Sequence, residues 1–240
     1  MDYKYSSVTN IGLKRKNNED SLGIFEVDNG ILAIVCDGLG GNKAGDIASQ
    51  LSVNSVYDYF QTSDLPDYLE RIKFSIMSTN KDLIEKSNTS PDLKGMATTI
   101  EVLFLKGNNA YWGHVGDSRI YFLRNSKLTQ LTKDHSLVQK LVDEGYLTLK
   151  EAEHHPNKNI IMRALGDNQK VEIDLSKMKL NSNEDFLFFI CTDGVTGVIN
   201  DLELEKIFSD YDKTNETLSK LIINRGAPDN FSFVTIAKNL

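Results

Sequence analysis

A short apolar run joined to an aspartate and a group of glycines, at Ile31–Gly41, constrains this chain most. The six apolar residues Ile31–Cys36 follow a turn signal and predict a buried strand. Asp37 follows directly, and three of the next four residues are the glycines Gly38, Gly40 and Gly41. A carboxylate at the end of a core strand is held rigidly, and glycines beside it allow a ligand close to the backbone. We therefore expect a core strand that ends at a site for a hard cation or an anion.

Length and charge exclude several classes of protein. With 240 residues, the chain can bury a sizeable core without a disulfide or a structural metal. Its two cysteines, Cys36 and Cys191, lie inside apolar runs and are predicted to be buried thiols. A net charge of −7 argues against nucleic acid or an anionic membrane as the main partner. No signal peptide is recognisable, and no apolar run approaches the ~20 residues that span a bilayer, so we predict a soluble cytoplasmic protein.

Hydrophobic periodicity divides the chain into short strands and paired helices. Strands are predicted at Tyr3–Thr9, Gly23–Val27, Ile31–Cys36, Ala97–Leu105, Ala110–Val115, Arg119–Leu123, Leu128–Leu131, Asn159–Ala164, Val171–Leu175, Asp185–Cys191 and Phe231–Ala237. Helices are predicted at Ala44–Phe60, from a cap at Ser63 or Asp64 through Leu83, and at Ser136–Asp143, Thr148–Glu153, Asp201–Phe208 and Thr214–Asn224. Closely spaced strands joined by turns form antiparallel sheets, so we expect an α+β fold with helices outside the sheets. No repeat or linker interrupts residues 1–240, which are predicted to form one domain.

Aspartates recur at the ends of these predicted strands. Like Asp37, Asp193 follows an apolar strand, and Asp229 lies just before the last strand. Glu19-Asp20 lies in the polar loop before the second strand. A single aspartate at a strand end is usually a turn residue. If antiparallel strands bring four of them to one rim, however, the charges repel one another, and two divalent cations would neutralise them.

The available ligand types indicate Mg²⁺ or Mn²⁺. The chain has four histidines, no HExxH motif and no Cys/His ligand spacing, which disfavours zinc. Oxygen ligands suit Mg²⁺ and Mn²⁺, and two such ions ~3.5–4 Å apart can activate a shared water to attack phosphorus. Arg15, four residues before Glu19, can hold phosphate oxygens in a bidentate grip. The alternative for Arg15 is a solvated charge run with Lys14 and Lys16.

Competing catalytic motifs are absent from the sequence. The glycine-rich segment Gly38–Gly45 lacks the Gly-Lys-Ser/Thr of a P-loop and does not fit GxGxxG. No GxSxG motif signals a serine nucleophile.

Eight short motifs occur in a fixed order along the chain. They are Asn17-Asn18-Glu19-Asp20, Asp37-Gly38-Leu39-Gly40-Gly41, Gly95-Met96-Ala97-Thr98-Thr99, Gly116-Asp117-Ser118-Arg119, Leu131–His135, Arg163-Ala164-Leu165-Gly166, Thr192-Asp193-Gly194 and Gly226–Asn230. Together they resemble the metal-dependent Ser/Thr protein phosphatases of the 2C type, in their compact bacterial form. The resemblance covers nearly the whole chain. It implies a four-layer α-β-β-α sandwich, in which two antiparallel sheets are flanked by helix pairs and the metals lie at one end.

The resemblance also implies a role for each matched residue. Asp37 corresponds to the ligand that bridges two metal ions, and Gly38 gives its backbone carbonyl to one of them. The other matches are the direct ligands Asp20, Asp193 and Asp229, Glu19 acting through water, Arg15 holding the phosphate, and Asp117 at a third, weaker metal site.

The chain departs from the family pattern at two positions. Relatives from eukaryotes often carry a histidine, proposed as general acid, where this chain has Leu39, so either metal-bound water protonates the leaving group or this protonation matters less. The third site often has a second aspartate where this chain has Gly197, which predicts a third ion that is weaker or differently held. The segment Gly145–Lys158 corresponds to the family's mobile flap. His114, in a predicted strand, is interpreted as structural rather than catalytic.

We expect hydrolysis of phosphoserine and phosphothreonine on proteins by a metal-activated water in one in-line step, without a covalent phosphoenzyme. The expected partners are phosphorylated proteins, including a Ser/Thr kinase whose signalling the enzyme opposes, and the chain is predicted to be a monomer. The alternatives are a metal-dependent phosphatase for small metabolites, a silent module that binds phosphoproteins, and a nuclease. The presence of all four aspartates disfavours the silent module, and the net charge of −7 disfavours the nuclease.

Overall fold

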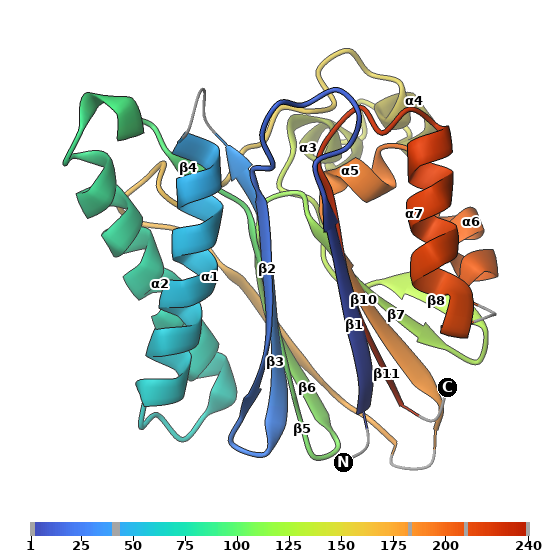
Figure 1. The fold of residues 1–240 in the computed structure, drawn as a ribbon, viewed down its shortest axis with the longest axis horizontal. Helices are drawn as coiled ribbons and strands as arrows, with labels where there is room; N and C mark the ends of the chain where they lie inside the picture. The colour runs from blue at the N-terminus through green and yellow to red at the C-terminus, as the bar shows by residue number, and fades with distance from the viewer. Residues whose placement is uncertain (1–2, 40–43, 182–183, 209–210, 239–240) are drawn as a thin grey trace.

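Two antiparallel sheets pack face to face in the computed structural model, and helices cover the outer face of each sheet (Figure 1). The structure describes residues 3–39, 44–181, 184–208 and 211–238. The strands are β1 (Tyr3–Asn10), β2 (Asp20–Val27), β3 (Gly30–Leu39), β4 (Ala97–Thr98), β5 (Ile100–Lys106), β6 (Asn109–Val115), β7 (Arg119–Arg124), β8 (Lys127–Gln130), β9 (Asp174–Lys179), β10 (Phe186–Cys191) and β11 (Phe231–Lys238). The helices are α1 (Ala44–Thr62), α2 (Tyr68–Ser87), α3 (Leu137–Asp143), α4 (Leu149–Glu153), α5 (Asp193–Thr196), α6 (Asp201–Ile207) and α7 (Thr214–Asn224).

The first and last strands of the chain lie side by side in one sheet. β1 pairs with β11 along its whole length, from Tyr3 opposite Lys238 to Asn10 opposite Phe231. This sheet has the order β1-β11-β10-β7-β8. The other sheet has the order β2-β3-β5-β6-β9, and β4 pairs with the end of β3. All of these strand pairs are antiparallel, which confirms the predicted α+β fold class.

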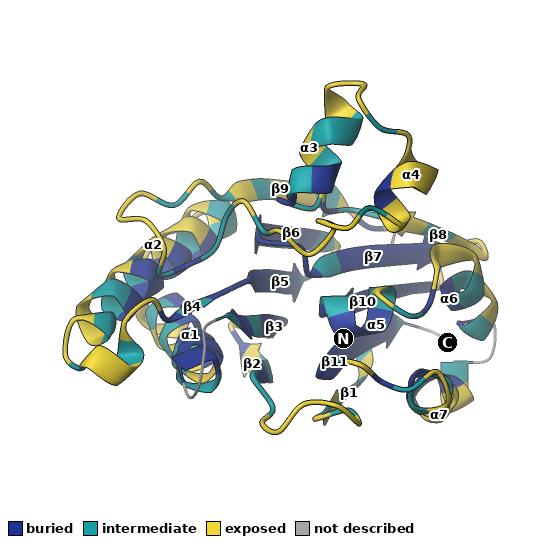
Figure 2. Cartoon of the chain, turned by 90° about the horizontal axis from the view of Figure 1, so that it is seen from above, coloured by how far each residue is buried: buried dark blue, intermediate teal, exposed yellow. Residues whose placement is uncertain are grey.

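Alternating side chains on the strands build three apolar layers. On β3, Leu32 and Ile34 pack against α1 and α2, whereas Ala33 and Val35 face the other sheet. On β10, Phe188 fills the layer between the sheets, and its neighbours on the strand pack against α5, α6 and α7. Two helical layers and two sheets therefore enclose the buried side chains, in the predicted α-β-β-α order (Figures 1 and 2).

Two predicted elements begin or break at different residues because polar side chains intervene. The helix predicted from Ser63 or Asp64 starts only at Tyr68, since the carboxylate of Asp67 caps it by accepting hydrogen bonds from two backbone N–H groups. The strand predicted at Ala97–Leu105 is interrupted at Thr99, where the side-chain hydroxyl, rather than a backbone carbonyl, pairs with β3.

Three further elements differ from the prediction. No strand forms at 159–164, where the structure has only an isolated bridge between Ile161 and Ser136. The strand predicted at Val171–Leu175 lies later in the chain, as β9, because it pairs with β6 over residues 174–179. The one-turn helix α5 was not predicted, since four residues are too few to show a helical period.

The structure also bears on the predictions for the cysteines and for membrane-spanning helices. Cys36 and Cys191 are buried and unpaired, as predicted. Gly40 and Gly41 lie outside the described residues. Across the ranges that the structure describes, no helix combines the length and the apolar composition needed to cross a membrane.

Replacing Phe188 tests the layer between the sheets. The Phe188 side chain is fully buried and lies 4.8 Å, between ring centroids, from Phe122. Phe188→Ala is expected to lower the free energy of unfolding by about 3–5 kcal/mol, measured by urea denaturation of the metal-free protein. The control Phe74→Ala removes a ring that is 44% exposed on α2 and should cost about 1 kcal/mol or less. Equal losses for the two variants would contradict this account of the core.

Candidate metal centre

The strand ends that carry the predicted aspartates meet at one end of the sandwich. β2 begins at Asp20, β3 ends just beyond Asp37, and these two residues lie directly opposite each other in the strand pair. β10 leads into α5, whose first residue is Asp193, and Asp229 lies just before β11. All of these ends lie at the top of the sheets in Figure 1. Because both sheets contribute, the acidic residues come together only when the sheets pack.

The hydroxyl of Thr192 connects the two sheets at this end. Thr192 follows β10, and its Oγ1 donates a hydrogen bond to Oδ2 of Asp20 on β2, at 2.9 Å. The same Oγ1 accepts a hydrogen bond from the backbone N–H of Ser232 on β11, at 3.0 Å. Thr192 is fully buried and Asp20 is only 7% exposed. The orientation of the Asp20 carboxylate therefore depends on β10 and β11 as well as on its own strand.

Asp37 is fixed through its backbone. Its N–H donates to Oγ1 of Thr99 at 2.9 Å, and its carbonyl accepts from the N–H of Thr99 at 2.9 Å and from Oγ1 of Thr98 at 2.8 Å. The next residue must be glycine, because a Cβ at Gly38 would lie 2.1 Å from the carbonyl oxygen of Gly45. These contacts position the Asp37 carboxylate without using its oxygens.

The side chain of Asn230 holds the loop between β1 and β2. Its Nδ2 donates to the carbonyls of Ile11 and Asn17, both at 2.9 Å. Its Oδ1 accepts from the N–H of Glu19, also at 2.9 Å. Asn230 is buried, so these three bonds satisfy its amide and order a loop that has no regular structure. The loop places Arg15 and Glu19 beside the aspartates.

Arg15 lies at the exposed side of this group. Its guanidinium donates to Oδ2 of Asp229 at 2.7 Å, with exposed side-chain fractions of 49% and 33%. Solvent screens such a pair, so it adds little to stability. A half-exposed guanidinium keeps further N–H donors available, and these can bind an anion such as phosphate.

The aspartates raise one another's pKa. Burial raises the pKa of Asp20 to about 7, and the charges of Asp193 and Asp229 add to this effect. Burial also raises the pKa of Asp37 well above its usual range, and Asp193, Asp20 and Asp117 raise it further. For Asp193, burial and then the charge of Asp229 raise the pKa. Mutual Coulombic effects of this kind require the carboxylates to be neighbours, as the sequence predicted.

Asp117 has an unpaired buried oxygen. It lies in the turn between β6 and β7, is 7% exposed, and has no hydrogen-bond partner at Oδ1. Burial raises its pKa to about 8, with further contributions from the charges of Asp193 and Asp134. An orphaned carboxylate oxygen in an acidic surrounding fits a cation better than a purely structural role.

The donor set fits hard divalent cations. Carboxylate and carbonyl oxygens are the ligands that Mg²⁺ and Mn²⁺ prefer, and positive charge would remove the repulsion among the buried acids. Within the described part of the chain, no three acidic, His or Cys side chains already stand in a ligating arrangement. Ion binding requires these carboxylates to lose the protons that their raised pKa values favour.

The structure also locates Leu39 and Gly197, the two residues that depart from the family pattern. Leu39 is half-buried at the end of β3 and brings no proton donor to the site. Gly197 is exposed at the end of α5, where its N–H donates to the carbonyl of Asp193. The flap segment at 145–158 includes α4, which projects from the sandwich together with α3 (Figure 2).

Sequence reasoning did not assign the residues that orient these carboxylates. Thr99, Thr192 and Asn230 were matched as parts of motifs, but no role was derived for them. Each is a polar residue within a motif and beside a buried strand. A polar residue in such a place needs hydrogen-bond partners, and this signal could have identified all three.

Comparisons with known proteins agree with this geometry. A sequence profile of the family described as "Protein phosphatase 2C" matches residues 14–225. The serine/threonine phosphatase Stp of Listeria welshimeri is 35% identical over 240 aligned residues, which cover 97% of this chain and 94% of that protein.

Solved structures show the same similarity. The S. agalactiae serine/threonine phosphatase superposes with a TM-score of 0.90 at 35% identity, covering 98% of this chain and 99% of that one. The catalytic domain of the phosphatase PstP, solved in complex with two manganese ions, superposes with a TM-score of 0.86 at 32% identity. That comparison covers 98% of this chain and 97% of the other.

The raised pKa values predict how stability depends on pH. A carboxyl group with a raised pKa in the folded state binds its proton more tightly there than in the unfolded chain. The folded state therefore loses stability as the pH rises from the pKa of the unfolded chain to the raised pKa of the folded state. For Asp20 and Asp117 the folded-state pKa values are about 7 and about 8. The Tm of the metal-free protein should therefore fall between about pH 5.5 and about pH 8.

Two further measurements complete this prediction. Mn²⁺ should raise Tm more at the higher pH, where the carboxylates are ionised. Asp193→Asn removes one of the repelling groups and should flatten the pH dependence of the metal-free protein. A metal-free Tm that rises across this pH interval would contradict the predicted mutual repulsion.

Proposed function

The chain belongs to the protein phosphatase 2C family and is a serine/threonine protein phosphatase, and on this premise we propose that the aspartates at the strand ends are its metal ligands. The observation that carries the proposal is the meeting of Asp20 and Asp37 in one strand pair with Asp193 and Asp229 from the other sheet. Four carboxylates at the same end of the sandwich are costly without cations and suited to bind them.

Each proposed ligand follows from its place in the fold. Asp37 lies centrally, since Asp20, Asp117, Asp193 and Asp229 all raise its pKa, and we assign it to both ions of a Mg²⁺ or Mn²⁺ pair. Gly38 would add its backbone carbonyl to this pair. The remaining assignments are Asp20, Asp193 and Asp229 as direct ligands, Glu19 as a ligand through water, and Asp117 as the ligand of a third, weaker ion.

The metal ions and the protein side chains would have different roles in the reaction. When bound, two divalent ions lower the pKa of a shared water and offset the charge that develops on the phosphoryl group. Arg15 is proposed to bind the phosphate oxygens with the guanidinium donors that Asp229 does not use. Asn230 and Thr192 hold the loop and the carboxylate in place before substrate arrives, so less ordering is needed on binding.

The substrates are phosphorylated proteins, and we propose that they include a Ser/Thr kinase whose signalling this enzyme opposes. The half-exposed Arg15 supports a substrate that docks from the surface rather than in a closed cavity. We also propose that residues 1–240 form one catalytic domain that acts as a monomer. The full-length pairing of β1 with β11 supports the single domain, because both ends of the chain contribute to one sheet.

The direct test is hydrolysis of a phosphothreonine peptide with Mn²⁺ present and after its removal by EDTA. Activity should require Mn²⁺ or Mg²⁺ and return when the ion is added back. Comparing kcat/KM for phosphopeptides and for sugar phosphates separates a protein phosphatase from an enzyme of small metabolites. Full activity in EDTA would overturn the proposed mechanism.

Asp193→Asn keeps the size of the side chain and removes its charge. A metal ligand contributes several kcal/mol to the transition state, so kcat should fall by at least about 100-fold. Circular dichroism should show an unchanged fold, and calorimetric titration should show weaker Mn²⁺ binding. Wild-type turnover in this variant would remove Asp193 from the ligand set.

Arg15→Ala tests the phosphate contact. Hydrogen bonds to charged groups are worth about 1.5–3 kcal/mol, so kcat/KM should fall by about 10–100-fold, with much of the loss in KM. The matched control is Lys14→Ala, which removes the neighbouring exposed charge of the same loop and should change kcat/KM by less than about threefold. Equal effects of the two variants would show that the loop acts by general charge and not through Arg15.

A further inference from the structure

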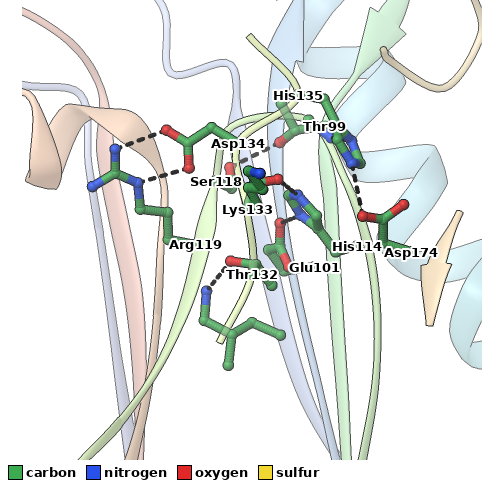
Figure 3. Close-up of polar contacts among 12 residues, drawn as sticks. Thr99, Glu101, His114, Ser118, Arg119, Thr132, Lys133, Asp134, His135 and Asp174 are labelled. Carbon is green, nitrogen blue, oxygen red and sulfur yellow. Dashed lines mark hydrogen bonds and ion pairs between the residues drawn. The ribbon is translucent and has the colours of Figure 1, made fainter. Parts of the chain in front are cut away.

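A second polar group lies between the sheets, beside the proposed metal centre. It contains Glu101 on β5, His114 on β6 and His135 after β8 (Figure 3). Glu101 is fully buried and His114 is 1% exposed, in a layer that is otherwise filled with apolar side chains. Buried polar groups of this kind are retained only where their hydrogen bonds hold something in place or serve the chemistry.

His114 ties the segment 131–135 to the sheet that carries β6. Its Nδ1 forms a short contact with Oε1 of Glu101, and its Nε2 lies 2.8 Å from the carbonyl oxygen of Lys133. A carbonyl only accepts hydrogen bonds, so Nε2 carries a proton and donates it. Both ring nitrogens of His114 are therefore used inside the protein, which confirms that it has a structural and not a catalytic position.

His135 forms two hydrogen bonds with the turn that contains Asp117. Its backbone N–H donates to the carbonyl of Gly116 at 2.7 Å, and its Nδ1 accepts from the N–H of Gly116 at 3.1 Å. An accepting Nδ1 has no proton, so the neutral ring carries its proton on Nε2, which lies 3.3 Å from Oδ2 of Asp174. Nη1 of Arg163 lies 3.1 Å from the same Nε2 and donates to Oδ1 of Asp174 at 3.1 Å, so His135 and Arg163 share this carboxylate. Gly116 is thus held by both of its backbone polar groups.

Burial, reinforced by the charge of His114, keeps His135 neutral. The rings of His114 and His135 lie 4.4 Å apart between centroids, too close for two positive charges without a large cost. Burial lowers the pKa of His114, but the Glu101 carboxylate outweighs this and raises it to about 9. Burial and then the charge of His114 lower the pKa of His135 to about 4. Burial also raises the pKa of Glu101, to about 7. Whichever member of that pair holds the proton, Nδ1 of His135 remains an acceptor for the N–H of Gly116.

The backbone of this turn requires glycine at position 116. Gly116 has φ = +120°, and a Cβ there would lie 2.6 Å from Cβ of Thr99. Beyond Asp117, Oγ of Ser118 pairs with Oγ1 of Thr99 at 2.9 Å, and the same Thr99 hydroxyl receives the N–H of Asp37. Asp117 thus lies between two anchored neighbours, one held by His135 and one by Thr99.

His135 also connects this turn to the end of the flap. Its carbonyl accepts from the N–H of Met162 at 2.6 Å. Two residues away, the N–H of Leu137 donates to the carbonyl of Ile160 at 2.9 Å. His135 is therefore hydrogen-bonded both to Gly116 and to the segment that follows α4.

We propose that His135 is a positioning residue that fixes the Gly116-Asp117 turn and the returning end of the flap relative to each other. It touches neither substrate nor ion; it acts by keeping the Asp117 carboxylate in place for the weak ion. This inference rests on the role proposed above for Asp117.

The test compares two variants that differ in which ring nitrogen they replace. His135→Asn places an amide oxygen near the position of Nδ1 and keeps an acceptor for Gly116. His135→Gln places its polar atoms near Nε2 and loses that acceptor. Hydrogen exchange of the metal-free full chain should be at least about tenfold faster at 116–119 and 160–163 in His135→Gln than in wild type, and close to wild type in His135→Asn. The control His154→Gln changes an exposed flap histidine and should leave both segments unchanged.

Mn²⁺ binding gives a second readout that does not depend on turnover. Calorimetric titration should show the weakest Mn²⁺ site weakened by about 10–100-fold in His135→Gln and the tighter sites unchanged. In the ¹⁵N spectrum of the wild-type protein near neutral pH, His135 should be neutral with its proton on Nε2. Unchanged hydrogen exchange in His135→Gln, or a charged His135 in that spectrum, would overturn the proposal.

The remaining outcomes separate this proposal from the one it rests on. Faster hydrogen exchange in His135→Gln without weaker Mn²⁺ binding would overturn the positioning role. Mobility of the turn would then have no effect on the affinity of the weakest Mn²⁺ site. Asp117→Asn tests the premise alone: if it leaves the weakest Mn²⁺ site unchanged, the assignment of Asp117 fails, whatever His135 does.

Discussion

The burial of several carboxylates at one end of the sandwich is the constraint on which the rest of this structure depends. Burial raises the pKa of Asp20, Asp37 and Asp193, and the charges of neighbouring acids add to the effect. A fold that gathers acids in this way must be stabilised elsewhere, here by apolar layers on both faces of each sheet. Divalent ions would relieve the repulsion, so ion binding and the stability of this end are thermodynamically linked.

Neutral hydrogen bonds do most of the positioning around these acids. The hydroxyls of Thr99 and Thr192 and the amide of Asn230 satisfy backbone groups or single carboxylate oxygens, and they connect elements far apart in the sequence. Such bonds hold the carboxylates in place without neutralising them. At Asp117 one oxygen is left without a partner, and burying an unpaired carboxylate oxygen is costly unless a cation or a hydrogen-bond donor meets it. The hydrogen bonds of His114 and His135 position the Gly116-Asp117 turn and the segment after the flap in the same way.

Much of the fold could be predicted from the sequence because the apolar periods of its elements are strong. The helix Thr214–Asn224 was predicted with its observed bounds, and the ends predicted for the strands at Ile31–Cys36 and Asp185–Cys191 lie one to three residues from the observed ends or coincide with them. The errors lie where a tertiary contact decides a boundary. Thr99 interrupts the predicted strand because its hydroxyl pairs with Asp37, and β9 begins where it meets β6. Local periodicity carries no information about either contact.

The sequence by itself determined which residues are acidic, which runs are strands, and the order of motifs that marks the family. Those properties are local, since they depend on side-chain chemistry and on the period of each element. Only the tertiary structure decided that Asp20 faces Asp37 across a strand pair, that Thr192 reaches Asp20 from the other sheet, and that His135 fastens Gly116. Each of these contacts joins residues that are near in space and distant in the chain, and they form only when the two sheets pack together.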